Sequence, residues 1–150
     1  MILHRRRAGF TVLEMLVVVS IFVVIAGLSF PPLSRFYTSQ QVIDSRSQVA
    51  EAIRTAQARS MAQIHGMSHG VFVEEHRFTL FQGPSFANRS TTLDTVFSVA
   101  ESLNLSTTFP DNQVLFLRGE QIPQATGTVM ISHINGRADQ VEVLENGRVE

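Results

Sequence analysis

The sequence predicts an α+β protein in which a long N-terminal helix packs on a C-terminal antiparallel β-sheet domain. Three observations predict this fold. Residues 10–30 form an almost unbroken apolar run, apolar residues then recur at helical spacings as far as Ile64, and beyond Gly70 the pattern changes to that of short strands. We therefore divide the chain into a leader (1–9), a transmembrane helix (10–30), an amphipathic stem helix (31–64) and a β head (65–150).

The chain of 150 residues has a net charge of −1, but its charges are unevenly distributed. Glu14 is the one charged residue of the apolar run, and Arg5, Arg6 and Arg7 stand just before it. Without those three arginines, nine remain against 13 carboxylates, so the rest of the chain is acidic and a poor partner for DNA or anionic lipid. There is no cysteine, which excludes disulfides, a thiol nucleophile and thiolate metal sites.

The apolar run is long enough to cross a bilayer, because about 20 helical residues span a hydrocarbon core of about 30 Å. Arginines on one side only predict a cytoplasmic N-terminus and an exported C-terminal part. Two other interpretations stay open. A secretory signal peptide could be cut near Gly27-Leu28-Ser29, although the run is longer than a usual signal core. A plain signal anchor leaves Glu14 unexplained, since a carboxylate in a membrane costs about 2.5–3.5 kcal/mol.

Residues Arg7-Ala8-Gly9-Phe10-Thr11-Val12-Leu13-Glu14 resemble the class III signal of type IV pilins and pseudopilins. That signal has a basic leader, a small residue before the cut, an aromatic residue after it and a glutamate as the fifth mature residue. The resemblance implies that prepilin peptidase cuts between Gly9 and Phe10, that Phe10 is N-methylated and that the helix is retained. It also implies that Glu14 meets the α-amine of a neighbouring subunit during assembly. The alternative is that Glu14 only reaches the membrane interface.

A second helical pattern follows the apolar run. Pro31 and Pro32 predict a kink at its start, or else a simple turn. Apolar residues at helical spacings predict an amphipathic helix from about Ser34 to Ile64, namely Val42, Val49, Ile53, Ala56 and Ile64. Its polar faces carry Arg46, Gln48, Glu51, Arg54 and Gln57. Gly66 and Gly70 are stop signals.

The head is predicted to consist of strands and turns. Val71–Glu75 and Arg77–Phe81 form a hairpin pattern around His76. Further strands are expected at Gln113–Leu117, Thr128–Ser132 and Gln140–Leu144, with another pair within Val96–Phe109, and tight turns at Asn135-Gly136 and Asn146-Gly147. The polar segment from Gly83 to Asn112 is expected to form variable, exposed loops.

The head resembles the H-type minor pseudopilin family, the GspH/FimT group. The resembling segments are Ala58-Arg59-Ser60-Met61-Ala62, Gly70-Val71-Phe72-Val73, Val114-Leu115-Phe116 with Gly119, Val129-Met130-Ile131-Ser132 and Asn146-Gly147-Arg148-Val149, and the likeness is weak between Gly83 and Asn112. It implies a pilin-like fold and a minor pseudopilin of a type II secretion system. Such a protein crosses the inner membrane once, holds its head in the periplasm and assembles into the pseudopilus near its tip.

The resemblance also implies partners. These are the other minor pseudopilins, the major pseudopilin, prepilin peptidase and the inner-membrane assembly platform, with the exported protein as a further candidate. The alternative is a minor type IV pilin of the FimT/FimU kind, in pilus assembly or DNA uptake.

Arg118, Arg137 and Arg148 are the candidate contacts for a partner or DNA in the head. DNA-binding relatives are expected to carry Gly-Arg-x-Arg near the C-terminus. Here Asp139 and Glu150 stand where the second arginine would be. Together with the acidic head, this argues against nucleic acid as a partner.

The sequence gives little support for an enzyme. It holds no G-x-S-x-G elbow, P-loop or HExxH pattern, so we expect no catalytic residues and no cofactor; an exported or anchored β domain with an enzymatic role is the remaining alternative. His65, His69 and His76 are too loosely spaced for a metal site, so we expect no bound metal and interpret them as surface histidines.

Overall fold

In the computed structural model, the described residues are 9–150, and the side chains of 28–35 are also left out of the description. The first helix, α1, runs from Val12 to Met61, and the chain divides into two compact units, Met1–Tyr37 and Thr38–Glu150. Residues 1–8 of the predicted leader lie outside the described residues. So do the side chains of Pro31 and Pro32, although the backbone there is helical. A simple turn at the two prolines is therefore wrong, and the kink stays a prediction.

The C-terminal half of α1 ends slightly earlier than the sequence predicts. Met61 is its last residue, Gln63 then adopts a left-handed backbone conformation with φ 52°, and a 3₁₀ turn, η1, spans Ile64–Gly66. The sequence predicts Ile64 on the buried face of the helix, but Ile64 is 39% exposed. The chain has already left the helix at Gln63, so helical periodicity no longer points Ile64 toward the core.

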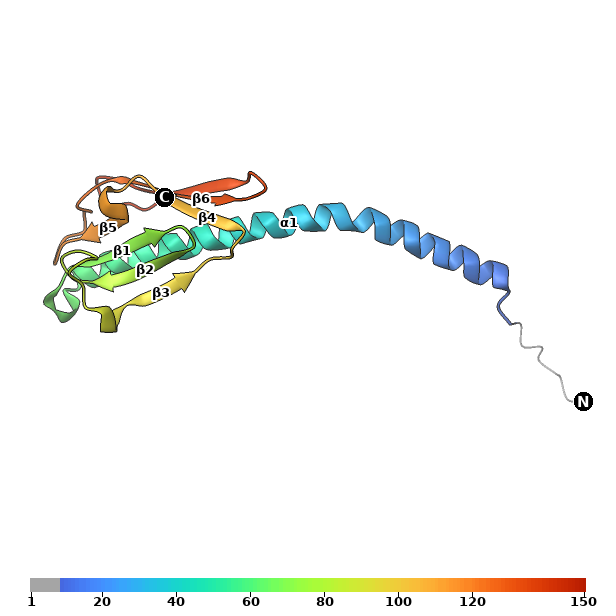
Figure 1. Ribbon diagram of the computed structural model, residues 1–150, viewed down its shortest axis with the longest axis horizontal. Coiled ribbons are helices and arrows are strands. Elements are labelled where there is room, and N and C mark those ends of the chain that lie inside the picture. The colour runs from blue at the N-terminus through green and yellow to red at the C-terminus, as the bar shows by residue number, and fades with distance from the viewer. Residues whose placement is uncertain (1–8) are drawn as a thin grey trace, which may run out of the picture. The chain divides into compact units, whose positions relative to one another are not determined.

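The head contains two antiparallel sheets (Figure 1). The first has the order β3-β2-β1-β5, with β1 His69–Glu74, β2 Arg77–Gln82, β3 Thr95–Ser98 and β5 Gln113–Phe116. The second has the order β4-β6-β7, with β4 Leu103–Thr107, β6 Gly127–His133 and β7 Ala138–Val143. Short 3₁₀ turns, η2 at Thr91–Leu93 and η3 at Pro110–Asn112, precede β3 and β5.

The predicted strands and the α+β class are confirmed, but the arrangement differs in one respect. The two strands predicted within Val96–Phe109 both exist, yet they belong to different sheets, because β3 pairs with β2 while β4 pairs with β6. The Asn135-Gly136 turn joins β6 to β7 as predicted, and Gly136 has a φ of 84°.

The core lies between the second half of α1 and the two sheets. The helix contributes small and β-branched side chains at helical spacing, and the sheets contribute aromatic and branched ones. The most deeply buried members are Val49, Ile53, Ala56, Phe78, Phe116, Val129, Ile131 and Val141.

The segment from Gly83 to Asp94 is not the free loop that its composition suggests. Phe86 stacks on Phe72 of β1 with ring centroids 3.7 Å apart, and the Arg89 guanidinium lies 3.6 Å from the centre of the Phe86 ring. Arg89 also forms a 2.7 Å ion pair with Asp94, whose side chain is largely buried. Aromatic stacking thus fixes this segment on one face of the first sheet.

Polar side chains of α1 hold the closing strands. Arg46 donates to the Gln140 carbonyl (3.0 Å) and Arg54 to the Val149 carbonyl (2.9 Å). Gln57 Nε2 donates to the carbonyls of Gln121 and Gly147, both at 2.7 Å. The polar face predicted for the stem helix is therefore partly an internal contact surface.

Candidate processing and assembly segment

The expected cleavage point lies just before α1. Gly9 and Phe10 have no regular secondary structure, and Phe10 is 80% exposed. A Cβ built on Gly9 would meet nothing within 4 Å. The peptide bond between them is thus exposed and outside a helix, which are the properties that a peptidase needs.

The first turn of α1 is capped by Thr11. Its Oγ1 accepts a hydrogen bond from the backbone N–H of Glu14 at 3.2 Å, and its carbonyl accepts one from the N–H of Met15. Thr11 and Glu14 have the spacing of a capping box, and a carboxylate in a first turn is favoured by the helix dipole. Sequence reasoning missed Thr11, although the Thr-x-x-Glu pattern signals it.

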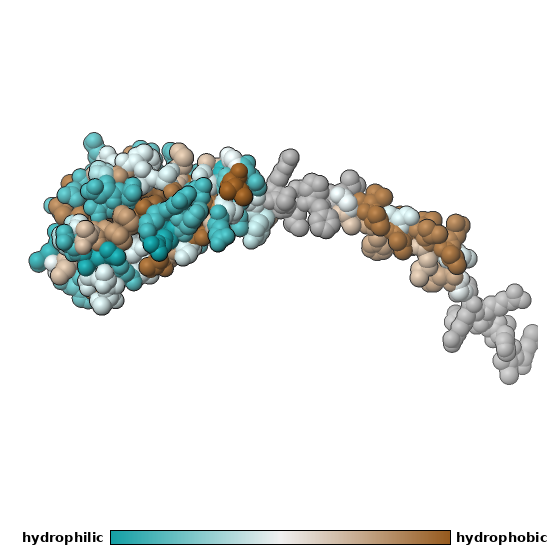
Figure 2. Space-filling model, in the orientation of Figure 1, coloured by the Kyte–Doolittle hydropathy of each residue, from teal (hydrophilic) through white to brown (hydrophobic). Residues whose placement is uncertain are grey.

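The first half of α1 presents apolar side chains in every direction. Twelve large apolar residues between Val12 and Ile25 are each 42–82% exposed. Figure 2 shows this described stretch as an almost continuous hydrophobic surface. The hydroxyl of Ser20 donates to the Leu16 carbonyl at 2.8 Å, which satisfies a polar group within the helix itself. A helix that is apolar all round is stable only where other apolar material covers it.

The three candidate arginines of the head lie at different places. Arg118 donates to Gln63 Oε1 at 3.2 and 3.3 Å, beyond the end of α1. Arg137 lies just before β7. Arg148 lies beyond the other end of β7, where its carbonyl accepts a hydrogen bond from the N–H of Leu144. The Arg148 side chain forms an ion pair with Glu150 at 3.0 Å. Leu144, which pairs with Arg148, follows Arg137 by seven positions, so the backbone positions of Arg137 and Arg148 are about 23 Å apart at 3.3 Å per residue. These two arginines do not form one basic patch.

Comparisons with known proteins agree with this geometry. Residues 4–30 match the family described as the prokaryotic N-terminal methylation motif. The structure resembles the minor pseudopilin EpsH from the type 2 secretion system of Vibrio cholerae, with a TM-score of 0.57, 17% identity, and coverage of 73% of this chain and 94% of that one. The chain has a pilin-like fold.

The second solved structure supports the same fold. The type IV minor pilin FimU of Pseudomonas aeruginosa matches the pilin-like chain with a TM-score of 0.61, 10% identity, and coverage of 77% of this chain and 90% of that one. No curated protein sequence matches the pilin-like chain significantly. At these identities, the two structures establish the fold, and the matched motif establishes a prepilin-type N-terminus.

Within the part of the pilin-like chain that the structure describes, no helix is both long and apolar enough to cross a membrane. The predicted transmembrane segment includes residues 28–30, whose side chains lie outside the described residues.

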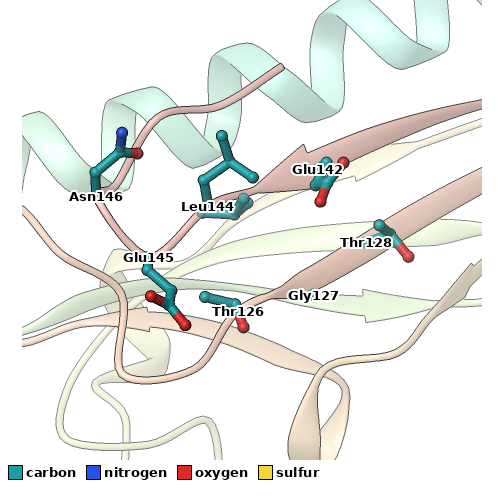
Figure 3. Close-up of a pocket in the computed structure, with 8 residues that line it drawn as sticks. Thr126, Gly127, Thr128, Glu142, Leu144, Glu145 and Asn146 are labelled. Atoms are coloured by element: carbon teal, nitrogen blue, oxygen red, sulfur yellow. The ribbon is translucent and has the colours of Figure 1, made fainter.

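A groove of the described surface lies on the second sheet of the pilin-like head (Figure 3). It measures about 590 Å³ and lies between the start of β6 and the end of β7, with Thr126, Thr128, Glu142, Glu145 and Asn146 among its lining residues. Thr128 and Glu142 are directly opposite each other across the two strands. Among the described residues, no three histidine or carboxylate groups come together in a way that could hold a metal ion.

The three histidines considered as metal ligands, His65, His69 and His76, have separate surroundings. His65 Nδ1 lies 3.0 Å from Gln82 Oε1, and His76 Nδ1 lies 2.9 Å from the Leu103 carbonyl. The interpretation of His69 as a surface residue is wrong, because it is 1% exposed. It is the first residue of β1, which lies between β2 and β5, and its backbone N–H donates to the buried hydroxyl of Ser60. Burial lowers the pKa of His69, and the charge of Arg59 lowers it further.

Proposed function

We propose that this chain is a minor pseudopilin of a type II secretion system. In this proposal, prepilin peptidase removes residues 1–9, Phe10 is N-methylated, and the retained helix crosses the inner membrane once. The N-terminus then lies on the cytoplasmic side and the head in the periplasm, until the subunit enters the pseudopilus near its tip. The role is structural, with no catalytic site.

The observation that carries the proposal is the uncovered apolar surface between Val12 and Ile25, directly after the exposed peptide bond Gly9–Phe10 at which we propose the cut. Burying its twelve large side chains at about 2 kcal/mol each would yield on the order of 20 kcal/mol. A bilayer supplies that cover before assembly, and the apolar helices of other subunits supply it afterwards.

Glu14 has a defined part in this proposal. Its carboxylate forms no ion pair among the residues that the structure describes. Cleavage would create a positive α-amine on Phe10, and the amine of a neighbouring subunit would match the Glu14 charge inside the filament. An unpaired carboxylate in lipid costs about 2.5–3.5 kcal/mol, so this pairing favours transfer from the membrane into the filament.

The partners proposed are the other minor pseudopilins, the major pseudopilin, prepilin peptidase and the inner-membrane assembly platform, with the exported protein as a further candidate. The fold shared with the minor pilin FimU supports a second candidate function, a minor subunit of a type IV pilus. Nucleic acid is a poor candidate partner, because Arg137 and Arg148 lie at opposite ends of β7.

The first experiment is the intact mass of the membrane-extracted chain, expressed with and without prepilin peptidase. We expect a chain that begins at Phe10 and carries one added methyl group only when the peptidase is present. Gly9→Leu should block cleavage without disturbing the fold, because a Cβ at Gly9 meets no neighbour. A chain that begins near Phe30, or stays uncut with active peptidase, contradicts the proposal.

The second experiment separates the charge of Glu14 from its structural role. Glu14→Gln keeps the Thr11 cap, because the capping donor is the backbone N–H of residue 14. We expect normal cleavage and normal membrane insertion but loss of the subunit from sheared filaments. Normal incorporation of Glu14→Gln would refute the charge-pairing step. Loss of protein secretion on deletion of the gene indicates the secretion pseudopilus, whereas loss of surface pili indicates the second candidate.

A further inference from the structure

The two sheets of the head have four outer edges, formed by β3, β5, β4 and β7. The edges of β5 and β7 are each covered by the segment that comes next in the sequence. On β5, Phe116 forms an isolated bridge with Pro123, and the N–H of Gln124 donates to the Leu115 carbonyl at 2.8 Å. On β7, Val143 bridges to Val149, and Glu142 and Glu150 exchange two hydrogen bonds of 2.9 and 3.0 Å. Neither edge offers a full row of free backbone groups.

The edge of β4 is covered by the hairpin turn between β1 and β2. The N–H of Leu105 donates to the Glu75 carbonyl at 2.8 Å, and the Leu103 carbonyl lies 2.9 Å from His76 Nδ1. In the described chain, this leaves the edge of β3 as the one outer edge with no covering segment, since β3 pairs with β2 alone.

The sequence of β3 also favours pairing with another strand. Thr95-Val96-Phe97-Ser98 is rich in β-branched and aromatic residues and holds neither a charged residue nor a proline. Charged residues and prolines are the usual devices that prevent pairing at an exposed edge. Val96 is 56% exposed, so an apolar side chain lies uncovered at this edge.

A groove of about 290 Å³ runs between this edge and α1. Thr95 and Phe97 of β3 line it, together with Leu80 of β2, while α1 contributes Gln48, Glu51, Ala52, Thr55 and Arg59. Alternate residues of a strand point to one face of the sheet. A strand added beside β3 would therefore place every second side chain in this groove, on the exposed flank of α1.

The charges of the groove specify what that strand should carry. Glu51 and Arg59 lie on one face of α1, two turns or about 12 Å apart, and neither forms an ion pair among the described residues. Residues four apart in a strand are about 13 Å apart and face the same way. Figure 1 shows β3 running opposite to α1, so a strand antiparallel to β3 passes Glu51 first and Arg59 second.

We propose that the open edge of β3 and this groove bind an extended segment of a different protein chain, as an added antiparallel strand. The segment carries a cationic residue and, four residues later, a carboxylate, with a small apolar residue between them. A second copy of this chain does not fit, because no arginine in it is followed by a carboxylate four residues later. The proposal goes beyond the proposed function and does not depend on leader cleavage or filament assembly.

The test uses the full uncleaved chain in detergent micelles and the capped peptide Thr-Arg-Thr-Val-Thr-Glu-Thr. We expect the peptide at millimolar concentration to slow hydrogen exchange at the amides of residues 95–98. A peptide with arginine and glutamate interchanged should bind about fivefold more weakly, since two exposed ion pairs become repulsive. A version of the first peptide that is N-methylated at alternate residues, along the edge that would face β3, keeps the side chains. It should not slow exchange in β3, because it lacks the backbone N–H donors of that edge.

A charge-reversed groove provides the sharper comparison. In the double variant Glu51→Arg with Arg59→Glu, the preference between the two charged peptides should reverse. The matched control, Glu145→Arg with Arg137→Glu, changes two exposed residues that flank β7, one before it and one after it, and should leave the preference as it was. Circular dichroism checks that both variants are folded. No slowing of exchange in β3 at millimolar peptide, equal protection by the N-methylated peptide, or a preference that the groove variant does not reverse would each overturn the proposal.

Discussion

His69 shows how a single titratable residue links the pilin-like head to pH. Its Nδ1 is buried without a hydrogen-bond partner among the described residues, and both burial and the Arg59 charge lower its pKa from the usual 6.5. The unfolded chain therefore takes up a proton at a higher pH than the folded head does. Stability is complete above about pH 6.5 and falls as the pH drops through 6.5 toward the lowered pKa.

We expect the thermal midpoint of the chain to fall between pH 7 and pH 5, and His69→Gln to reduce that fall. The readout is the slope of the midpoint against pH, measured in detergent micelles. His76→Gln is the matched control, because His76 is exposed and is not among the charges that act on the His69 pKa, and it should keep the slope of the unmodified chain. An identical slope in His69→Gln and the unmodified chain would show that another group is responsible.

Gly70 lies where β1 is packed most tightly. A Cβ there would be 2.5 Å from the Val114 carbonyl oxygen and 2.7 Å from the Phe81 ring. We expect Gly70→Ala to destabilise the head by about 3 kcal/mol, measured by urea unfolding, because backbone and a packed ring must move.

Gly136→Ala is the comparison for Gly70→Ala. A Cβ at Gly136 meets nothing within 4 Å, but its φ of 84° is unfavourable for other residues. Gly136→Ala should therefore lower the free energy of unfolding by about 1 kcal/mol. Equal losses in the two variants would contradict the steric explanation for Gly70.

At the scale of elements, α1 combines two different kinds of surface. Its first half is apolar in all directions, whereas its second half has a buried stripe and polar side chains that bond to the closing strands. The periodicity of the sequence predicted the stripe. It could not show that Arg54 and Gln57 reach carbonyls 64 to 95 residues away, because a hydrogen bond to a distant backbone leaves no local pattern.

We expect Gln57→Ala to lower the thermal midpoint of the chain by about 4 °C. Both carbonyls bonded to its amide, those of Gln121 and Gly147, would lose a partner at a cost of about 1 kcal/mol. Gln48→Ala on the same helix is the control, since Gln48 is exposed and forms no hydrogen bond in the described chain. A Gln48→Ala midpoint as low as that of Gln57→Ala would show that helix propensity, not this contact, decides the effect.

At the scale of the whole molecule, the core does not need the apolar half of α1. Every buried core residue of the described chain lies at or beyond Val42, within the unit Thr38–Glu150. We expect a fragment of residues 38–150 to fold cooperatively without detergent, while the full chain requires it. Circular dichroism and gel filtration provide the measurement, and a fragment that aggregates or lacks a melting transition would contradict this division.

The sequence by itself determined the α+β class, the prepilin-type signal around Gly9, Phe10 and Glu14, and the positions of most strands, because these depend on local order and on periods of two or 3.6 residues. Tertiary structure alone decided that β3 and β4 join different sheets, that His69 is buried, that Phe86 stacks on Phe72 of β1 and that Arg137 lies far from Arg148. Those facts depend on which distant segments become neighbours. Strand partners and burial are set by the packing of the two sheets against one helix, and no stretch of neighbouring residues encodes them.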